Sequence, residues 1–166
     1  YTLTRNTDPI DAVEEEGDGY YYTDVIGREA VRQIEAFARQ KDKPFFQYVA
    51  FTAAHWPLHA REQDIARYER AYLGGWDSVR TDRHEELKGM GILDSRWRIS
   101  ARHADVVPWN EAPDREWEAM RMAVYAAQVD RMDQGIGRIL KALDDAGVAD
   151  ETLVLFLSDN GGCAEG

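Results

Sequence analysis

With 166 residues, 44% of them hydrophobic and 11% aromatic, the chain can bury a core of about one domain. Its formal net charge of −11 argues against a general binder of nucleic acid or anionic membranes, because such surfaces need clustered lysine and arginine. An anionic substrate is not excluded, since one cationic or metal-bearing pocket can outweigh the global charge. No apolar run approaches the roughly 20 residues of a membrane span, and no signal peptide opens the sequence. We therefore expect no nucleic-acid partner and no membrane insertion.

The first forty residues predict a loop followed by a helix. Residues 1–19 are polar and contain a proline, an acidic run and a Gly-Asp-Gly turn signal, which together indicate a loop. Residues 23–40 then carry apolar side chains near helical spacing. Thr23 or Asp24 is the expected cap at the beginning of this helix, because both side chains can accept a hydrogen bond from a free backbone N–H.

The middle of the chain predicts a strand, a loop and two helices. The stretch Phe45–Phe51 is short, aromatic and β-branched and follows a proline, which favours a strand. Residues 52–60 form a loop in which a proline prevents regular structure. Helices are expected near residues 62–70 and 76–89, and an irregular stretch extends from there to about residue 113.

The last third predicts a long helix and a second strand. Apolar side chains recur three to five residues apart over residues 114–147, with Asp114 at the beginning and Gly147 after the end. Gly135 and Gly137 are expected to weaken or bend this helix locally. Residues 152–157 are apolar on both alternations, as a strand covered on two faces must be.

This order of elements is typical of an α/β fold with parallel strands. Two strands do not make a stable parallel sheet. We therefore expect the remaining strands to come from a longer protein of which this sequence is a segment.

Both predicted strands are followed by polar side chains. His55 follows the first strand, and Asp159 and Asn160 follow the second. Ligands collect beyond the carboxyl ends of the strands in open α/β sheets, so the two strand ends predict a shared functional site. Each also has a simpler interpretation, because Asp-Asn-Gly-Gly is a common turn sequence and a loop histidine beside a tryptophan is often packed or solvated.

Several separated blocks resemble one known family. They are "DGYYYTDVI", "PFFQYVAFTAAHWPLHA", "GWDSVRTDRHEELKGMGI" and "YAAQVDRMDQGIGRILKALDDAGVADETLVLFLSDNGGCAEG". In consistent order over nearly the whole chain, they resemble a type I sulfatase of the alkaline-phosphatase superfamily. The resemblance implies a mixed, mostly parallel sheet flanked by helices. It also implies that residues 1–166 are the central segment of the catalytic domain, without the N-terminal nucleophile part and the C-terminal subdomain.

The resemblance assigns roles to residues at both strand ends. Asp159 and Asn160 match a late pair of metal ligands, normally for Ca²⁺, which fits their hard oxygen donors. His55 matches the histidine that contacts the bridging oxygen of the sulfate ester and assists the leaving group. Ala54 departs from the commoner proline at its position. His59 is a possible substrate contact, with a structural role as the alternative.

Other parts of such an enzyme are missing from the sequence. The family's nucleophile is a formylglycine made from a C/S-x-P/A-x-R motif, and Cys163 in "CAEG" does not match this motif. The early paired aspartates of the metal site and the sulfate-binding lysines are also absent. With two or three of about six oxygen ligands, the segment alone is expected to bind metal weakly and to catalyse nothing.

The intact enzyme is expected to hydrolyse a sulfate ester of a small molecule or sugar. Its expected location by resemblance is periplasmic or secreted, and the single cysteine, which excludes an intrachain disulfide, leaves the compartment open. A phosphodiesterase or phosphonate monoester hydrolase of the same superfamily is one alternative. A non-catalytic fragment is another.

The remaining conspicuous side chains have structural interpretations. Asp130 and Asp133 are expected to form a solvated or ion-paired face of the long helix. The sequence after His84 does not fit a zinc motif of the H-E-x-x-H type. Four tryptophans could line a sugar-binding rim, although core packing is the expected role of most: Trp76, Trp97, Trp109 and Trp117.

Overall fold

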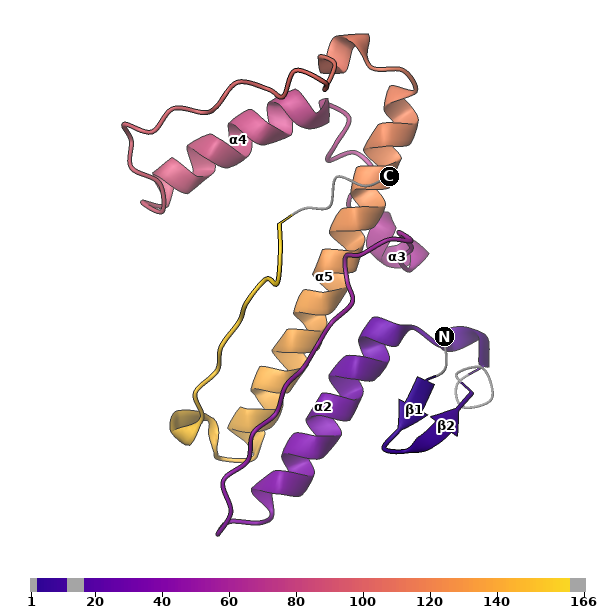
Figure 1. Ribbon diagram of the computed structural model, residues 1–166, viewed down its shortest axis with the longest axis vertical. Helices are drawn as coiled ribbons and strands as arrows, with labels where there is room; N and C mark the ends of the chain where they lie inside the picture. Colours follow the sequence, from indigo (N-terminus) through magenta and orange to yellow (C-terminus); the bar gives the residue numbers. More distant parts are fainter. Residues whose placement is uncertain (1–2, 12–16, 162–166) are drawn as a thin grey trace. The chain divides into compact units, whose positions relative to one another are not determined.

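The computed structural model describes residues 3–11 and 17–161 (Figure 1). The chain divides into two compact units, each described here by itself: unit 1 comprises residues 1–55 and 131–166, and unit 2 comprises residues 56–130. Within the described ranges, no helix is long and apolar enough to cross a membrane.

The N-terminal stretch that was predicted as a loop contains a small antiparallel sheet. Its two strands are β1 (Leu3–Arg5) and β2 (Asp8–Ile10), the only paired strands in the described part of the chain. Asn6 takes a left-handed backbone (φ 57°) in the tight turn between them, a conformation that asparagine tolerates. The prediction was therefore wrong for these residues, and the acidic run Glu14–Glu16 lies outside the described residues.

Helix α2 (Tyr22–Ala38) follows a short 3₁₀ turn, η1 (Gly17–Gly19), and confirms the helix predicted here. The predicted cap was wrong, because the N-cap residue is Tyr21 and no side chain caps the helix. Asp24 instead accepts two hydrogen bonds of 2.7 Å from the guanidinium of Arg131. Two charge-assisted bonds stabilise this mostly buried carboxylate more than a single cap bond would.

Helix α5 (Arg115–Asp145) confirms the long predicted helix. Its end is closed by two backbone hydrogen bonds, from Gly147 to the carbonyl of Asp144 (2.9 Å) and from Val148 to the carbonyl of Leu143 (3.1 Å). This Schellman pattern needs a left-handed residue after the helix, and the glycine supplies it with φ 67°.

The core of unit 1 lies between α2 and the last turns of α5. Ile34, Ala142 and Leu143 are its fully buried side chains. Partly buried apolar residues from both helices and from the segments that follow them pack against this cluster: Val31, Phe45, Ile139, Val148 and Ala149. The helical periodicity of the sequence thus places one apolar face of each helix in a common core.

Glycines allow the two helices to approach closely. A Cβ atom on Gly27 of α2 would lie 3.4 Å from the Cα atom of Gly135 in α5. A Cβ atom on Gly135 would in turn lie 3.3 Å from the ring of Phe51. Gly135 therefore makes room for a helix and an aromatic ring, which is a reason for a glycine inside a long helix that periodicity alone does not show.

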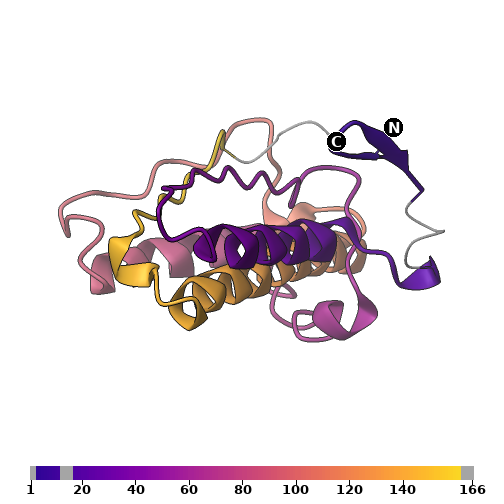
Figure 2. The same cartoon turned by 90° about the horizontal axis from the view of Figure 1, so that it is seen from below.

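The two predicted strands are present as extended chain. Residues 45–51 follow α2, and residues 153–157 follow α5 and the 3₁₀ turn η3 (Ala149–Glu151). Each segment runs antiparallel to the helix before it, so the two segments run in the same direction (Figures 1 and 2). Neither segment belongs to a hydrogen-bonded ladder, and Phe46 and Tyr48 are 89% and 82% exposed. The mixed parallel sheet is therefore not confirmed, whereas the alternation of helix and extended chain is as predicted.

Unit 2 contains shorter helices than predicted at its beginning. Helix α3 (Glu62–Ile65) has four residues and continues only as turns, so most of the helix predicted over 62–70 is absent. Helix α4 (Gly75–Gly89) confirms the next prediction. Its first residue has φ 76°, which favours glycine and separates the turns from the helix. The irregular stretch is confirmed apart from one 3₁₀ turn, η2 (Trp109–Glu111).

Candidate functional site

His55 lies directly beyond the first extended segment. A hydrogen bond of 2.9 Å from its backbone N–H to the carbonyl of Thr52 closes a turn after Phe51. His55 itself is exposed. The loop expected over residues 52–60 is confirmed, since it contains neither helix nor strand. The structure thus presents the imidazole on an irregular loop at the end of an extended segment, as the sequence predicted.

Asp159 and Asn160 lie in a bend at the end of the second extended segment, and both are exposed. Ser158 Oγ donates to the backbone carbonyl of Asn160, and Asn160 Nδ2 donates to the carbonyl of Gly161, both at 2.6 Å. Asn160 Nδ2 thus bonds to the backbone, and the side chains of Asp159 and Asn160 offer a carboxylate and an amide oxygen on adjacent residues. This pair of hard oxygen donors fits Ca²⁺ or Mg²⁺ and suits Zn²⁺ poorly.

The loop that carries His55 and the bend that carries Asp159 and Asn160 occupy equivalent positions in unit 1. Because the extended segments run in the same direction, His55 and the Asp159–Asn160 pair both follow the C-terminal end of a segment (Figures 1 and 2). A search of the described residues finds no group of three or more His, Cys, Asp or Glu side chains that could hold a metal ion. The metal role of Asp159 and Asn160 therefore stays a prediction, and Cys163 lies outside the described residues.

His59 belongs to unit 2, on the part of the loop after His55. It is exposed, as a substrate contact would be. On the same loop, the indole of Trp56 is 40% exposed, and the guanidinium carbon of Arg121 lies 5.1 Å from its ring centre. The sequence does not reveal this contact, because a cation–π pair 65 positions apart along the chain leaves no local pattern.

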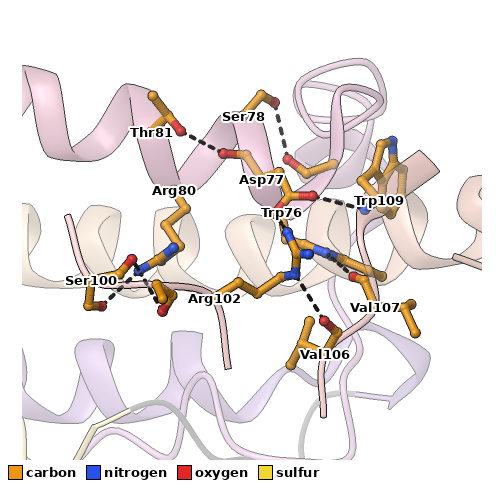
Figure 3. Close-up of polar contacts among 12 residues, drawn as sticks. Trp76, Asp77, Ser78, Arg80, Thr81, Ser100, Arg102, Val106, Val107 and Trp109 are labelled. Atoms are coloured by element: carbon orange, nitrogen blue, oxygen red, sulfur yellow. Dashed lines mark hydrogen bonds and ion pairs between the residues drawn. The ribbon is translucent and has the colours of Figure 1, made fainter. Parts of the chain in front are cut away.

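A second polar cluster, in unit 2, attaches the irregular stretch to α4 (Figure 3). The carboxylate of Asp77 accepts hydrogen bonds from Arg102 (2.8 Å) and from the backbone N–H of Trp109 (2.9 Å). Arg80 donates to the backbone carbonyl and the hydroxyl of Ser100. The Trp109 N–H, followed by the Arg102 guanidinium, lowers the pKa of the Asp77 carboxyl below its usual value.

Two of the four tryptophans belong to this cluster. The rings of Trp76 and Trp109 pack edge to face with centroids 4.7 Å apart, and the first donates to the carbonyl of Val107 (3.1 Å) (Figure 3). A Cβ atom on Gly75 would overlap the Trp109 ring at 1.9 Å, so this position accepts only glycine. These two rings are half-buried and pack against each other. Trp97 and Trp117 are instead 58% and 62% exposed.

Asp130 forms part of an ion-paired face on α5, as expected. Its carboxylate accepts hydrogen bonds from Arg67 (2.6 Å) and from the hydroxyl of Tyr68 (3.0 Å). Burial, together with the hydrogen bond to Asp130, raises the pKa of Tyr68. The arrangement attaches the turns after α3 to the long helix and has no feature that points to chemistry.

A cavity of about 810 Å³ lies between α2 and α5 in unit 1. Its lining contains five cationic side chains (Arg28, Arg39, Arg131, Arg138 and Lys141) and three acidic ones (Asp24, Glu35 and Asp145). The rest of the lining consists of small apolar residues (Val31, Ala38, Ala142 and Ala146). The ion pairs of Asp24 with Arg131 and Arg138 belong to this wall. Their main effect is to join the two helices.

Comparison with known proteins places the whole sequence in one family. Residues 1–166 match the family model described as Sulfatase. The chain is 33% identical over 175 residues to an uncharacterized sulfatase of Schizosaccharomyces pombe, covering 98% of this chain and 29% of that protein. It is 33% identical over 154 residues to an arylsulfatase of Klebsiella aerogenes (87% and 31%) and 35% identical over 122 residues to the N-sulphoglucosamine sulphohydrolase of Homo sapiens (74% and 22%).

The chain therefore spans 22% to 31% of the length of these relatives. The match includes both extended segments and the bends that follow them. The chain belongs to the sulfatase family, which has an α/β fold like that of alkaline phosphatase.

Proposed function

We propose that the intact protein is a sulfuric ester hydrolase, which converts a sulfate ester and water into an alcohol and sulfate. Membership of the sulfatase family along all 166 residues is the observation that carries this proposal. The polar side chains beyond the two parallel extended segments support it, because ligands collect at this end of the strands in open α/β sheets.

His55 acts on the leaving group in this proposal. Cleavage of the sulfur–oxygen bond leaves charge on the bridging oxygen, and an imidazole can donate a hydrogen bond or a proton to it. The exposed position of His55 on an irregular loop is consistent with contact to a substrate from outside the chain. His59 would contact the substrate from the same loop.

Asp159 and Asn160 hold part of a Ca²⁺ site in this proposal. A bound Ca²⁺ would supply positive charge that stabilises the sulfonyl oxygens and orients the nucleophile. The residues fit this ion, because the Asn160 amide nitrogen is engaged by the backbone and both side chains present oxygen. The remaining ligands would come from parts of the intact protein that these 166 residues do not include.

The nucleophile would also come from outside these residues, since the sequence contains no C/S-x-P/A-x-R motif. Formylglycine would supply the nucleophilic oxygen. The proposal treats residues 1–166 as the central segment of the catalytic domain. In the intact domain, the segments 45–51 and 153–157 would pair with further strands in a mixed, mostly parallel sheet, which would cover their exposed apolar side chains.

The proposed substrates are sulfate esters of small aromatic alcohols or of sugars. The names of two relatives indicate an aryl sulfate as substrate of the arylsulfatase and an N-sulfated sugar, in which the sulfur is bonded to nitrogen, as substrate of the N-sulphoglucosamine sulphohydrolase. The family membership does not favour phosphodiesters, but the shared superfamily makes them the appropriate comparison.

The test compares 4-nitrophenyl sulfate with bis(4-nitrophenyl) phosphate and with a phenylphosphonate ester as substrates of the intact protein. We expect kcat/KM to be highest for the sulfate ester, and a higher value for either phosphorus ester would contradict the proposal. His55→Ala should lower kcat about 10² to 10⁴-fold, with the larger losses for poor leaving groups, as for a lost general acid. His103→Ala is the matched control, because His103 is exposed and lies on the irregular stretch of unit 2.

A further inference from the structure

Arg121 makes two kinds of contact at once. Its guanidinium carbon lies 5.1 Å from the centre of the Trp56 ring, which is within the range of a cation–π interaction. Its Nη1 lies 3.1 Å from both carboxylate oxygens of Glu118, one turn earlier on α5. A rigid helix therefore holds the guanidinium in place, and the guanidinium holds an indole that lies on a loop.

The partial burial of this group distinguishes it from an ordinary surface ion pair. The side chains of Arg121 and Glu118 are 34% and 32% exposed, and Trp56 is 40% exposed. Exposed ion pairs contribute little to stability, whereas a cation–π contact strengthens as its partners are desolvated. The planar guanidinium can stack on a ring and donate hydrogen bonds to a carboxylate in its plane, which a lysine ammonium does less well.

The indole that Arg121 holds belongs to the residue directly after His55. Consecutive Cα atoms across a trans peptide are about 3.8 Å apart, so fixing Trp56 limits where the backbone of His55 can lie. The loop around it has no helix or strand to restrain it. A restraint on Trp56 therefore also restrains the backbone that carries the imidazole.

We propose that Arg121 is a positioning residue, which holds the His55 loop by stacking on Trp56 while Glu118 anchors its guanidinium. The inference rests on the proposed function, because it needs His55 to act on the leaving oxygen. Small displacements of a group that acts in the transition state lower the rate of chemistry much more than they lower substrate binding. Loss of Arg121 should therefore lower kcat, mainly for substrates that need the imidazole most.

The experiment measures kcat and KM of the intact protein for a series of aryl sulfates with leaving groups of different pKa. Arg121→Gln should lower kcat about tenfold for poor leaving groups and less than twofold for good ones, with KM nearly unchanged. Arg121→Lys should recover only part of the loss, because it keeps a cation beside the ring but lacks the planar group that stacks on it. Glu118→Gln should give a smaller version of the same pattern, and it keeps the test valid if Arg121→Gln does not fold.

Arg115→Gln is the matched control on the same helix, and it should leave kcat unchanged for every substrate. Equal losses of kcat across all leaving groups, or identical behaviour of Arg121→Gln and Arg115→Gln, would overturn the inference. His55→Ala separates the two levels of the argument. If it shows the leaving-group dependence and Arg121→Gln does not, only the positioning role fails, whereas if neither shows it, the proposed role of His55 fails and the inference with it.

Discussion

Asp77 attaches the irregular stretch of unit 2 to α4. Its carboxylate bonds to Arg102 and to the backbone of Trp109, and both partners lie more than twenty residues further along the chain. Because these hydrogen bonds favour the ionised carboxylate, they lower its pKa in the folded state. Residues 91–108 of this stretch contain no helix or strand that could hold it in place.

The contribution of Asp77 to stability should depend on pH. Its folded pKa lies below the value of about 3.9 in an unfolded chain, so the contribution is complete above about pH 5. It is lost as the pH falls below about 4 and through the folded pKa. Asp77→Asn should therefore lower the Tm of the protein at pH 6, and the difference from the wild type should shrink at pH 3.

Thermal melting followed by circular dichroism checks this expectation. Asp82→Asn is the control, because Asp82 is an exposed acid on the same helix. It should leave the Tm unchanged at both values of pH. A difference between Asp77→Asn and the wild type that stays constant from pH 6 to pH 3 would contradict the account.

At the residue scale, the sequence predicted side chains whose position follows from local structure. His55, Asp159 and Asn160 lie beyond the ends of apolar extended segments, as predicted, and their functional roles stay predictions. Asp24 was misassigned as a cap because its actual partner, Arg131, lies 107 positions away. A hydrogen-bond partner at such a separation depends on how the helices pack, and local pattern does not contain that information.

At the element scale, helices were the most predictable feature. The apolar periodicity of α2 and α5 extends over several turns, so their existence and approximate ends follow from the sequence. The strands were found as extended segments but not as a sheet, because a strand needs hydrogen-bonding partners that the 166 residues do not supply. Helix α3 was overestimated, since the residues after Ile65 form turns up to the left-handed Gly75.

Two glycines in α5 allow a matched test of the packing against α2. A Cβ atom on Gly137 would meet no atom within 4 Å, whereas one on Gly135 would lie 3.3 Å from the Phe51 ring. Gly137→Ala should raise the free energy of unfolding by about 0.5–1 kcal/mol, because alanine favours the helix. Gly135→Ala should gain less or lose stability, because the Phe51 ring must move by a few tenths of an ångström to make room for the new Cβ atom.

Chemical denaturation of both variants measures these free energies. The expected order is Gly137→Ala above the wild type, with Gly135→Ala lower than Gly137→Ala by about 1 kcal/mol or more. Equal stabilisation by the two substitutions would show that Phe51 does not pack against the helix at Gly135.

At the scale of the whole molecule, the main feature of the described residues is an extended segment whose apolar side chains are exposed. Leu153, Leu155 and Leu157 are 84%, 74% and 82% exposed, although their sequence is typical of a strand buried on two faces. The chain spans less than a third of each of the three relatives described above. We infer that further parts of the intact protein cover these side chains and complete the proposed site.

The dependence of sulfate-ester hydrolysis on free Ca²⁺ tests the central claim most directly, namely that this chain contributes Asp159 to the metal site of a sulfatase. In the intact protein, Asp159→Ala should raise the half-saturating Ca²⁺ concentration by about a hundredfold or more, because ligand charge sets Ca²⁺ affinity over several decades. Asp150→Ala, in the 3₁₀ turn η3 that precedes the same extended segment, should leave it unchanged. Full activity of Asp159→Ala at the wild-type Ca²⁺ requirement would contradict the account.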